Sequence, residues 1–323
     1  MTPTSKQAGK LKIVVLAGGI SHERDISLKS GRRVADALAE KGAQVIMHEP
    51  DHELLENLKK DKPDVIWPVL HGASGEDGAL REILSLTGIP FVGATGAAAK
   101  LAWDKAVAKI LASRAGIETP GSITLPRETF RELDADSILK LVTKSMALPV
   151  VVKPARSGSA QGVTIVKKQE QLNQAMIDAY VYCDVAIIED FVEGTELAVG
   201  VIDTGAGPVA LPAVEIQPRS GHFGFEERYI AGETDYFVPA RLTKTIAAKA
   251  AKMAIAAHET LGLRHLCRVD MIVDAKGVPW FLEANVLPGL TETSLLPQAI
   301  IASGSTLGDV YYSLAQAAAK GRG

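Results

Sequence analysis

Four polar residues that could take part in metal chemistry lie on two consecutive predicted strands near the C-terminal end of the chain: Arg268, Asp270, Glu283 and Asn285. If a four-residue loop joins these strands into a hairpin, Arg268 lies opposite Asn285 and Asp270 lies opposite Glu283, all on one face. Two carboxylates that face each other at roughly 5 Å repel unless a cation or a shared proton lies between them.

Magnesium is the economical cation for this hairpin, because it prefers oxygen ligands and usually combines one or two carboxylates with phosphates. Asp270, Glu283 and the amide oxygen of Asn285 are therefore the candidate ligands, placed beside a nucleotide. The alternative is a solvated polar face on an edge hairpin, and a register slip of one residue would move Glu283 to the other face.

A second candidate site follows the predicted strand 150–153. Lys153 ends this strand, and the next loop carries Gly158 and Gly162 together with the hydroxyls of Ser157 and Ser159. Such a loop brings backbone amides close to phosphates while the lysine supplies a point charge. It is not a Walker A motif, because GK followed by Ser or Thr is missing. Taken alone, the pattern also fits a solvated turn.

Two further segments give weaker hints of a nucleotide site. Lys105 stands in the first turn of a helix that Asp104 is expected to cap, where the helix dipole disfavours a cation unless an anion is near. Glu189 and Glu196 flank the apolar pair at 191–192, a segment that could bind an adenine edge through its backbone and a ribose through a carboxylate. In isolation these acids would be surface charges.

The segments that follow the first and third predicted strands place Glu23, His71, Glu76 and Asp77 in one crevice. Ligands bind at the carboxyl ends of the strands in open parallel sheets. The alternative is that His71 is a structural histidine and that Glu76 and Asp77 are a solvated pair at a helix start.

The elements that must position these residues form an α/β unit followed by an α+β region. Buried runs at 12–17, 45–50 and 64–72, with a helix from 27 to 41, predict a parallel sheet. Strands are expected at 150–153, 162–167 and 185–192 in a second unit. A third unit should contain a helix at 244–261 and strands at 196–202, 209–216, 267–273 and 279–285.

Composition limits the function classes. With 47% hydrophobic and 23% charged residues the chain is an ordinary globular protein, and 323 residues suffice for two or three domains. A formal charge of −3 lacks the cation excess that nucleic-acid binding needs, so we expect no nucleic-acid partner. The polar first ten residues and the lack of a long apolar run predict no signal peptide, no membrane span and a cytoplasmic location.

The ordered set GGISHERDIS, HGASGEDG, WDKAVAK, VVVKPARSGSAQG, IIEDFVEGTE, CRVD and FLEANVLPGLTETSLLP resembles the D-alanine–D-alanine ligases of the ATP-grasp superfamily. The resemblance runs from about residue 12 to the end of the chain. It implies an ATP-grasp fold behind an N-terminal open parallel-sheet (pre-ATP-grasp) domain, with an N-terminal unit at 1–93, a central unit at 94–188 and a C-terminal unit at 189–323. It also implies a homodimer.

The resemblance further implies a role for each candidate residue. The phosphates of ATP would meet Lys105 and Lys153, and two magnesium ions, with manganese as an alternative, would be held by Asp270, Glu283 and Asn285. The adenosine would be surrounded by Glu189, Phe191, Val192 and Glu196. The catalytic set would be Glu23, Ser159, Tyr229, Arg268 and the backbone N–H of Gly289. The two D-alanines would also contact His71, Arg228, Ser294 and Leu295.

The implied reaction activates a carboxylate, which is a poor electrophile. Its oxygen attacks the γ-phosphorus of ATP to give an acyl phosphate, and the amine of a second D-alanine then attacks the carbonyl. Because the acyl phosphate would hydrolyse in water, a closing lid is needed, and the candidate is the stretch 219–232. The product, D-alanyl-D-alanine, belongs to peptidoglycan synthesis and thus to cell-wall formation and cell shape.

Several positions depart from the family pattern and leave the second substrate open. Arg228 stands where most members have lysine, Phe223 and Phe225 replace common lid tyrosines, and Ala160 replaces a serine of the glycine loop. Tyr229, which the family associates with an amine acceptor, disfavours D-lactate. The remaining alternatives are a ligase that joins D-alanine to D-serine or another small D-amino acid, and a catalytically silent nucleotide-binding homologue.

Overall fold

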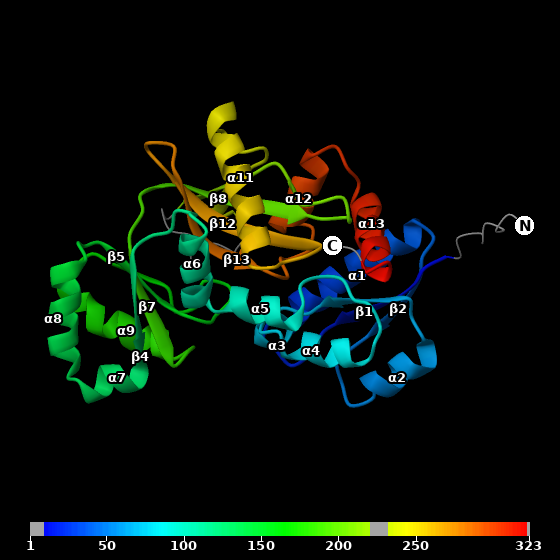
Figure 1. Cartoon of the computed structure of the whole chain (residues 1–323), viewed down its shortest axis with the longest axis horizontal. Helices are drawn as coiled ribbons and strands as arrows, with labels where there is room; N and C mark the ends of the chain where they lie inside the picture. The colour runs from blue at the N-terminus through cyan, green and yellow to red at the C-terminus, as the bar shows by residue number, and fades with distance from the viewer. Residues whose placement is uncertain (1–9, 220–231, 322–323) are drawn as a thin grey trace, which may run out of the picture.

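The apolar run at 12–17 forms the central strand of a three-stranded parallel sheet. A computed structural model describes residues 10–219 and 232–321, and in it the sheet has the order β2-β1-β3. Its strands are β1 (Lys12–Ala17), β2 (Gln44–His48) and β3 (Val65–Val69). The predicted N-terminal parallel sheet is therefore confirmed (Figure 1, right).

Four helices connect and cover this sheet: α1 (Arg24–Glu40), α2 (Leu54–Asp61), α3 (Ala73–Glu76) and α4 (Ala79–Leu86). Helix α1 begins three residues before the predicted start at Ser27, because Glu23 rather than a later residue occupies its N-cap. It ends before Gly42, whose φ of +85° is the left-handed conformation expected of a helix stop.

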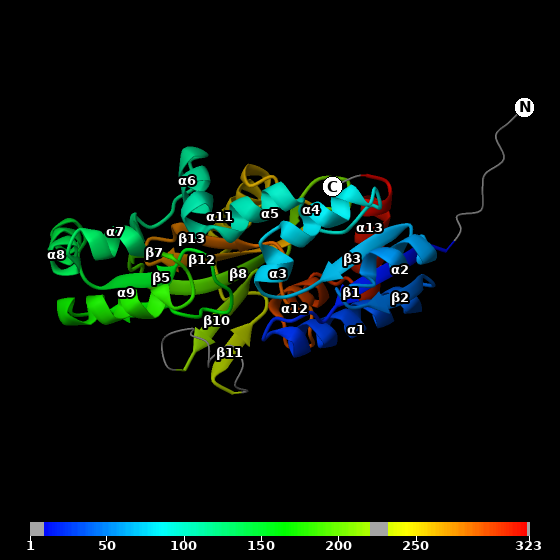
Figure 2. The ribbon, with the colours of Figure 1, turned by 90° about the horizontal axis from the view of Figure 1, so that it is seen from below.

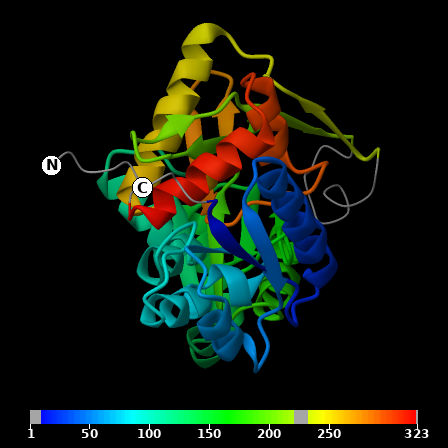
Figure 3. The same ribbon diagram turned by 90° about the vertical axis from the view of Figure 1, so that its right-hand side faces the viewer.

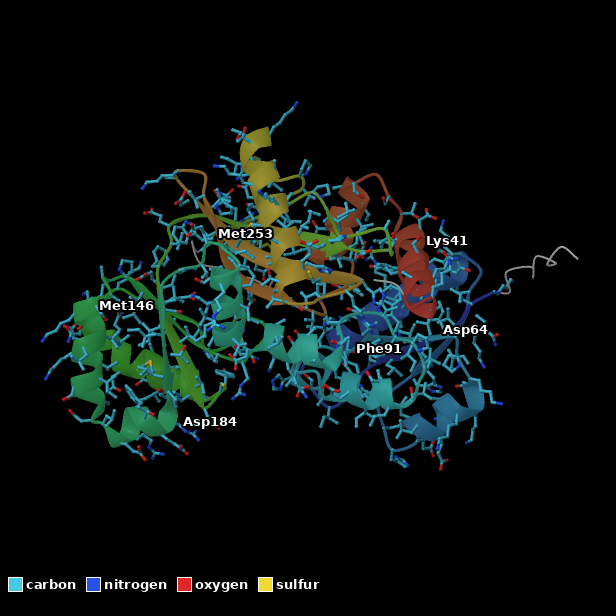
Figure 4. The ribbon with its side chains drawn as sticks, in the orientation of Figure 1. Lys41, Asp64, Phe91, Met146, Asp184 and Met253 are labelled. Atoms are coloured by element: carbon cyan, nitrogen blue, oxygen red, sulfur yellow. The ribbon has the colours of Figure 1, made fainter. Side chains whose placement is uncertain are left out.

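The second sheet forms a lobe of its own at the left of Figure 1. Its four antiparallel strands run in the order β4-β7-β5-β6 and pack on helices that complete a separate apolar core. The strands are β4 (Ser122–Pro126), β5 (Val150–Pro154), β6 (Thr164–Val166) and β7 (Val185–Asp190), and the helices are α7 (Arg127–Glu132), α8 (Ala135–Ser145), η1 (Gln169–Gln171) and α9 (Leu172–Tyr180). Met146, labelled in Figure 4, lies in this core.

The third sheet carries the predicted hairpin. Its path is β11-β10-β8-β12-β13, with β9 paired to β8, and helix α11 packs on it. The elements are β8 (Gly194–Ile202), β9 (Val209–Ala210), β10 (Val214–Pro218), β11 (Thr234–Phe237), α11 (Lys244–Thr260), β12 (Leu266–Asp274) and β13 (Pro279–Asn285). Figure 2 shows β10 and β11 extending below the other strands.

The single strand predicted at 209–216 is wrong. The chain forms two strands there, β9 and β10, which pair with β8 in registers that differ by one residue. Pro212 lies between them, and because proline has no N–H to donate it interrupts a continuous ladder.

The first and third sheets share their cores through helices that cross between them. Helices α5 (Gly96–Trp103) and α6 (Lys105–Arg114) pack on β13, whereas the last helices, α12 (Leu295–Ala302) and α13 (Leu307–Ala319), follow the third sheet in sequence. Helix α13 returns to contact α1 and β3, as Figure 3 shows. In the described ranges, no helix is both long and apolar enough to span a membrane.

Gly31 shows how closely α1 approaches its sheet. It lies buried in the middle of the helix, where glycine is normally unfavourable, and a β-carbon there would overlap the β-carbon of Ala17 in β1. The glycine is therefore explained by close helix–strand packing.

We expect Gly31→Ala to lower the free energy of unfolding by about 1–3 kcal/mol, because the added methyl group overpacks the interface with β1. The control is Ala39, an exposed residue of the same helix, where Ala39→Gly should cost about 0.5–1 kcal/mol through ordinary helix propensity. Urea unfolding measures both. A more stable Gly31→Ala protein would show that the packing argument is wrong.

Candidate active site

The β12–β13 hairpin has the predicted pairing at its chemically important end. Arg268 lies opposite Asn285, and Asp270 lies opposite Glu283. The two carboxylates therefore face each other on neighbouring strands, as the sequence predicted.

The turn of this hairpin differs from the predicted four-residue loop. The Asp274 N–H donates to the Val278 carbonyl at 3.0 Å, so the turn is one residue tighter. A carboxylate oxygen of Asp274 accepts from the Lys276 and Val278 N–H groups at 2.9 Å each and stabilises it. A bulge between Asp270 and Met271 shifts the register back by one residue. The two departures cancel at the candidate site.

Protein cations already neutralise the two facing carboxylates. Arg268 donates two hydrogen bonds of 2.7 Å to Asp270, and Lys105 Nζ lies 3.1 Å from Glu283 Oε2. Burial alone would lower the pKa of Arg268, but the Asp270 carboxylate raises it above its usual value. The cation that the sequence required is thus supplied by side chains, and repulsion between the carboxylates does not by itself demand magnesium.

The residues nevertheless fit magnesium by their donor chemistry. Two carboxylates and the amide oxygen of Asn285 are hard oxygen donors on one strand pair. Asn285 Oδ1 also accepts a 2.9 Å hydrogen bond from the Leu287 N–H, which fixes the amide. Among the described residues there is no group of three or more His, Cys, Asp or Glu side chains arranged to hold a metal, so an ion here would complete its shell with other oxygens.

Helix α6 presents Lys105 to this site. Asp104 caps the helix, accepting hydrogen bonds from the N–H groups of Ala106 and Val107. Lys105 Nζ also donates to the Ser157 carbonyl at 2.7 Å. The cation at the positive end of the helix dipole is therefore offset by Glu283, the nearby anion that the sequence called for.

A second group of buried charges consists of one carboxylate and two lysines. Glu189 receives Lys153 on one oxygen and Lys109 on the other, each at 2.5 Å. Burial would raise the pKa of Glu189, but the two lysines together lower it. Sequence reasoning missed Lys109. One signal in the sequence is its spacing of four residues from Lys105, which places both lysines on one face of the helix.

These groups surround a cavity of about 430 Å³ between the second and third sheets. All the residues expected around ATP line it, including the two lysines and two of the three expected metal ligands: Lys105, Lys153, Glu189, Phe191, Val192, Glu196, Asp270 and Glu283. The apolar walls come from residues such as Val151, Ile165 and Ile272. The cavity therefore combines apolar walls with charged groups.

A second cavity, of about 1170 Å³, adjoins the first sheet and extends along α1. The expected substrate residues that the structure describes all line it, together with Glu76 and Asn285: Glu23, His71, Ser159, Arg268, Gly289, Ser294 and Leu295. Lys105, Ser157 and Glu283 line both cavities. The two spaces thus meet at the end where the lysine and the hairpin carboxylate pair.

Glu23 and Ser159 link the N-terminal sheet to the glycine loop. The Ser159 hydroxyl donates to Glu23 Oε1, although the two residues are 136 positions apart in the sequence. Ser159 and Ala160 both have left-handed φ values, +53° and +55°, which turns the loop over the cavity. The structure thus brings together two residues of the expected catalytic set. Tyr229, a third member of that set, lies outside the described residues, as do Arg228 and positions 220–231 of the expected lid.

His71 and the loop after β13 are joined through α1. Ser30 Oγ lies 3.2 Å from His71 Nε2 and accepts a hydrogen bond from the Leu290 N–H at 3.3 Å. Burial lowers the pKa of His71, so the ring is neutral at pH 7. Ser294, further along this loop, contacts the Thr291 hydroxyl at 2.7 Å. Ser30 therefore links His71 to the loop after β13, a contact that sequence reasoning did not find.

Three comparisons with known proteins bear on this site. Sequence profiles described as D-ala D-ala ligase N-terminus and D-ala D-ala ligase C-terminus match residues 46–94 and 111–316. The D-alanine–D-alanine ligase of Pelotomaculum thermopropionicum is 35% identical over 308 residues, which cover 95% of this chain and 96% of that protein.

Solved structures agree with the sequence comparisons. The D-alanine–D-alanine ligase of Bacillus anthracis complexed with ATP superposes with a TM-score of 0.79 at 26% identity, covering 96% of this chain and 97% of that one. The D-Ala:D-Ser ligase VanG of Enterococcus faecalis gives a TM-score of 0.81, also at 26% identity, covering 94% and 98%. The fold is thus that of ATP-grasp ligases.

Glu76 makes the stability of the folded protein depend on pH. It is buried on α3, where one carboxylate oxygen accepts the Gly72 N–H at 2.9 Å, and burial raises its pKa to about 8. In the unfolded chain the carboxyl group ionises near pH 4.5. Between these values the unfolded chain has lost a proton that the folded protein keeps, so this group lowers stability as pH rises.

We therefore expect the stability advantage of Glu76→Gln over the native protein to grow between pH 5.5 and pH 7.5, by up to about 1.4 kcal/mol per pH unit. Urea unfolding at several pH values measures it. Glu56→Gln, on the exposed face of α2, is the control and should show no such trend. An advantage of Glu76→Gln that stays constant with pH would contradict the raised pKa.

Proposed function

This chain belongs to the D-alanine–D-alanine ligase family, and we propose that it uses ATP to join two D-alanines into D-alanyl-D-alanine for peptidoglycan synthesis. The observation that carries the proposal is the meeting of two cavities at Lys105, Ser157 and Glu283. A nucleotide in one cavity would present its terminal phosphate to a carboxylate in the other at that point.

The nucleotide assignment rests on the 430 Å³ cavity. Adenosine would lie against Phe191 and Val192, with Glu189 and Glu196 near its polar edges. The triphosphate would extend toward Lys153 and Lys105, because their ammonium groups offset the repulsion between phosphate oxygens. A structurally similar ligase, that of Bacillus anthracis, is complexed with ATP, which supports ATP as the nucleotide.

Magnesium, or manganese, held by Asp270, Glu283 and Asn285 would neutralise phosphate charge, and we propose two ions. The ion pair between Lys105 and Glu283 is compatible with this. When the nucleotide binds, Lys105 can exchange the carboxylate for a phosphate oxygen while Glu283 turns to a metal ion. Each of the two side chains would then keep a partner of opposite charge: a phosphate for Lys105 and a metal ion for Glu283.

The first step forms the electrophile. The carboxylate oxygen of the first D-alanine attacks the γ-phosphorus of ATP. The bond between the γ-phosphorus and the bridging oxygen breaks, which gives an acyl phosphate and ADP. We propose that Glu23 binds the amino group of this D-alanine and that neutral His71 lies near its carboxylate. The hydrogen bond from Ser159 holds Glu23 in place.

The second step makes the peptide bond. The neutral amine of the second D-alanine, held near Ser294 and Leu295, attacks the acyl carbonyl, and the C–O bond to phosphate then breaks. The departing phosphate takes up the proton that the nitrogen loses. Arg268 and the Gly289 N–H would stabilise the oxyanion that forms on the way. Asp270 orients Arg268 by accepting two hydrogen bonds from it. Their ion pair spans the two cavities, because Arg268 lines one and Asp270 lines the other.

The proposal includes features that rest on the family resemblance. These are the roles of Arg228 and Tyr229, lid closure by 219–232, domain boundaries at 93/94 and 188/189, a cytoplasmic location and a homodimer. Each sheet lies largely within one proposed domain, but the 188/189 boundary falls inside β7 (Val185–Asp190), a strand of the second sheet.

The acceptor is tested by ADP release. With ATP, magnesium and D-alanine alone, we expect ADP and D-alanyl-D-alanine in equal amounts, and no faster ADP release when D-serine or D-lactate is added. A chromatographic assay of the products identifies the dipeptide. Absence of ADP with D-alanine alone, together with activity on a mixture with D-serine, would replace the proposed acceptor. ATP binding without ADP release in any mixture would indicate a silent homologue.

Glu283→Gln tests the hairpin with little risk to the fold. We expect turnover to fall at least 100-fold, because the variant loses a metal ligand, while the thermal midpoint changes by only a few degrees. Lys105 keeps its bond to the Ser157 carbonyl in this variant. Asp270→Asn is a poorer probe, since it leaves the buried guanidinium of Arg268 without its carboxylate, which costs about 3–5 kcal/mol.

The control for this experiment is Glu259→Gln, an exposed change near the end of α11, which should keep turnover within twofold. Removal of divalent ions with a chelator should abolish turnover of the native enzyme and be reversed by magnesium. Turnover of Glu283→Gln near the native value would refute the hairpin assignment.

A further inference from the structure

The pair of lysines on Glu189 points to a function for Lys109. Lys109, Glu189 and Lys153 form a continuous buried chain of charges, with both ion pairs at 2.5 Å. All three side chains are less than one-tenth exposed. Glu189 thus has two cations where one would neutralise it.

The two lysines occupy different positions relative to the cavity. Lys153 and Glu189 line the 430 Å³ cavity, whereas Lys109 is not among the described residues that line it. Lys109 approaches Glu189 from α6, while Lys153 comes from the end of β5. Lys153 can therefore reach a bound phosphate, and Lys109 reaches only the carboxylate behind it.

A second buried lysine on helix α6 is costly, because burial removes water from its ammonium group. Ala108 and Ala112, its neighbours on α6, are buried, and burial lowers the pKa of Lys109, with Glu189 opposing that effect. An apolar side chain would fill this position without desolvating a charge. The ammonium group is therefore best explained by what it does for Glu189.

We propose that Lys109 is a positioning residue of the nucleotide site, which keeps Glu189 neutralised so that Lys153 is released to bind phosphate. The inference rests on the proposed function, because it requires a nucleotide in this cavity. If Lys153 were the sole counter-ion of Glu189, its movement toward a phosphate would leave a buried carboxylate unpaired. That penalty would weaken the binding of ATP.

Helix α6 thus supplies a lysine to each of two carboxylates that line the cavity. Lys105, one turn earlier, pairs with Glu283 of the hairpin, and Lys109 pairs with Glu189 of the second sheet. In this proposal Lys105 moves to a phosphate of the nucleotide, whereas Lys109 remains paired with Glu189.

The test compares ATP binding in Lys109→Met, whose side chain has a similar length but no charge, with binding in the native enzyme. Isothermal titration with magnesium and a non-hydrolysable ATP analogue measures the affinity directly. We expect Lys109→Met to weaken binding 10- to 100-fold and to raise the KM for ATP similarly, with the KM values for D-alanine within about twofold. Lys109→Arg, which keeps the charge, should restore most of the affinity.

A double-mutant comparison shows whether the effect passes through Glu189. In a Glu189→Gln background there is no carboxylate to neutralise, so Lys109→Met should change ATP affinity less than threefold. Lys252→Met, on the exposed side of α11, is the matched control and should bind ATP as the native enzyme does. If Lys109→Met does not fold, as judged by circular dichroism, Lys109→Gln is used in the same comparison.

Unchanged ATP affinity in a folded Lys109→Met protein would overturn the inference. An equal loss of affinity in both backgrounds would also overturn it, because Lys109 would then act independently of Glu189. Failure of the native enzyme to bind the analogue would instead overturn the proposed function, so the two failures are distinguishable.

Discussion

Charge neutralisation inside the crevice between the second and third sheets is the constraint on which the site depends. Three of the acids that line it are each matched by cations of the chain: Glu189 by Lys109 and Lys153, Asp270 by Arg268, and Glu283 by Lys105. Unpaired buried charges would be too costly to keep. The same groups are those proposed to bind a triphosphate and its metal ions, and in the structure these lysines and acids pair with one another.

The fold brings these charges together from distant parts of the sequence. Helix α6 contributes two lysines, β5 a third, and the β12–β13 hairpin the facing acids. The glycine loop after β5 lies between the two cavities, and its Ser159 reaches back to Glu23 at the start of α1. Because the first and third sheets share cores through α5, α6 and α13, the crevice and the substrate cavity are parts of one packed framework. Catalysis by positioning and electrostatics requires such a framework.

Much of this arrangement follows from the sequence, and the exceptions have physical causes. The parallel sheet, the Asp104 cap and the facing pair Asp270–Glu283 were all predictable from local pattern. The pairing was correct although the turn was not, because a bulge compensated for a tighter loop. Lys109 was missed because its partner Glu189 lies 80 residues away, and only tertiary packing shows that a lysine on a helix is buried. The break at Pro212 shows proline overriding a continuous β pattern.

We propose that lysines and carboxylates of the 430 Å³ cavity exchange partners when a nucleotide and divalent ions bind together. The most direct test is the thermal midpoint of unfolding with magnesium alone, ATP alone and both. Exchange predicts that the shift with both exceeds the sum of the separate shifts, because phosphates release the lysines while the metal takes up the freed acids. A shift with ATP alone as large as that with ATP and magnesium would contradict it.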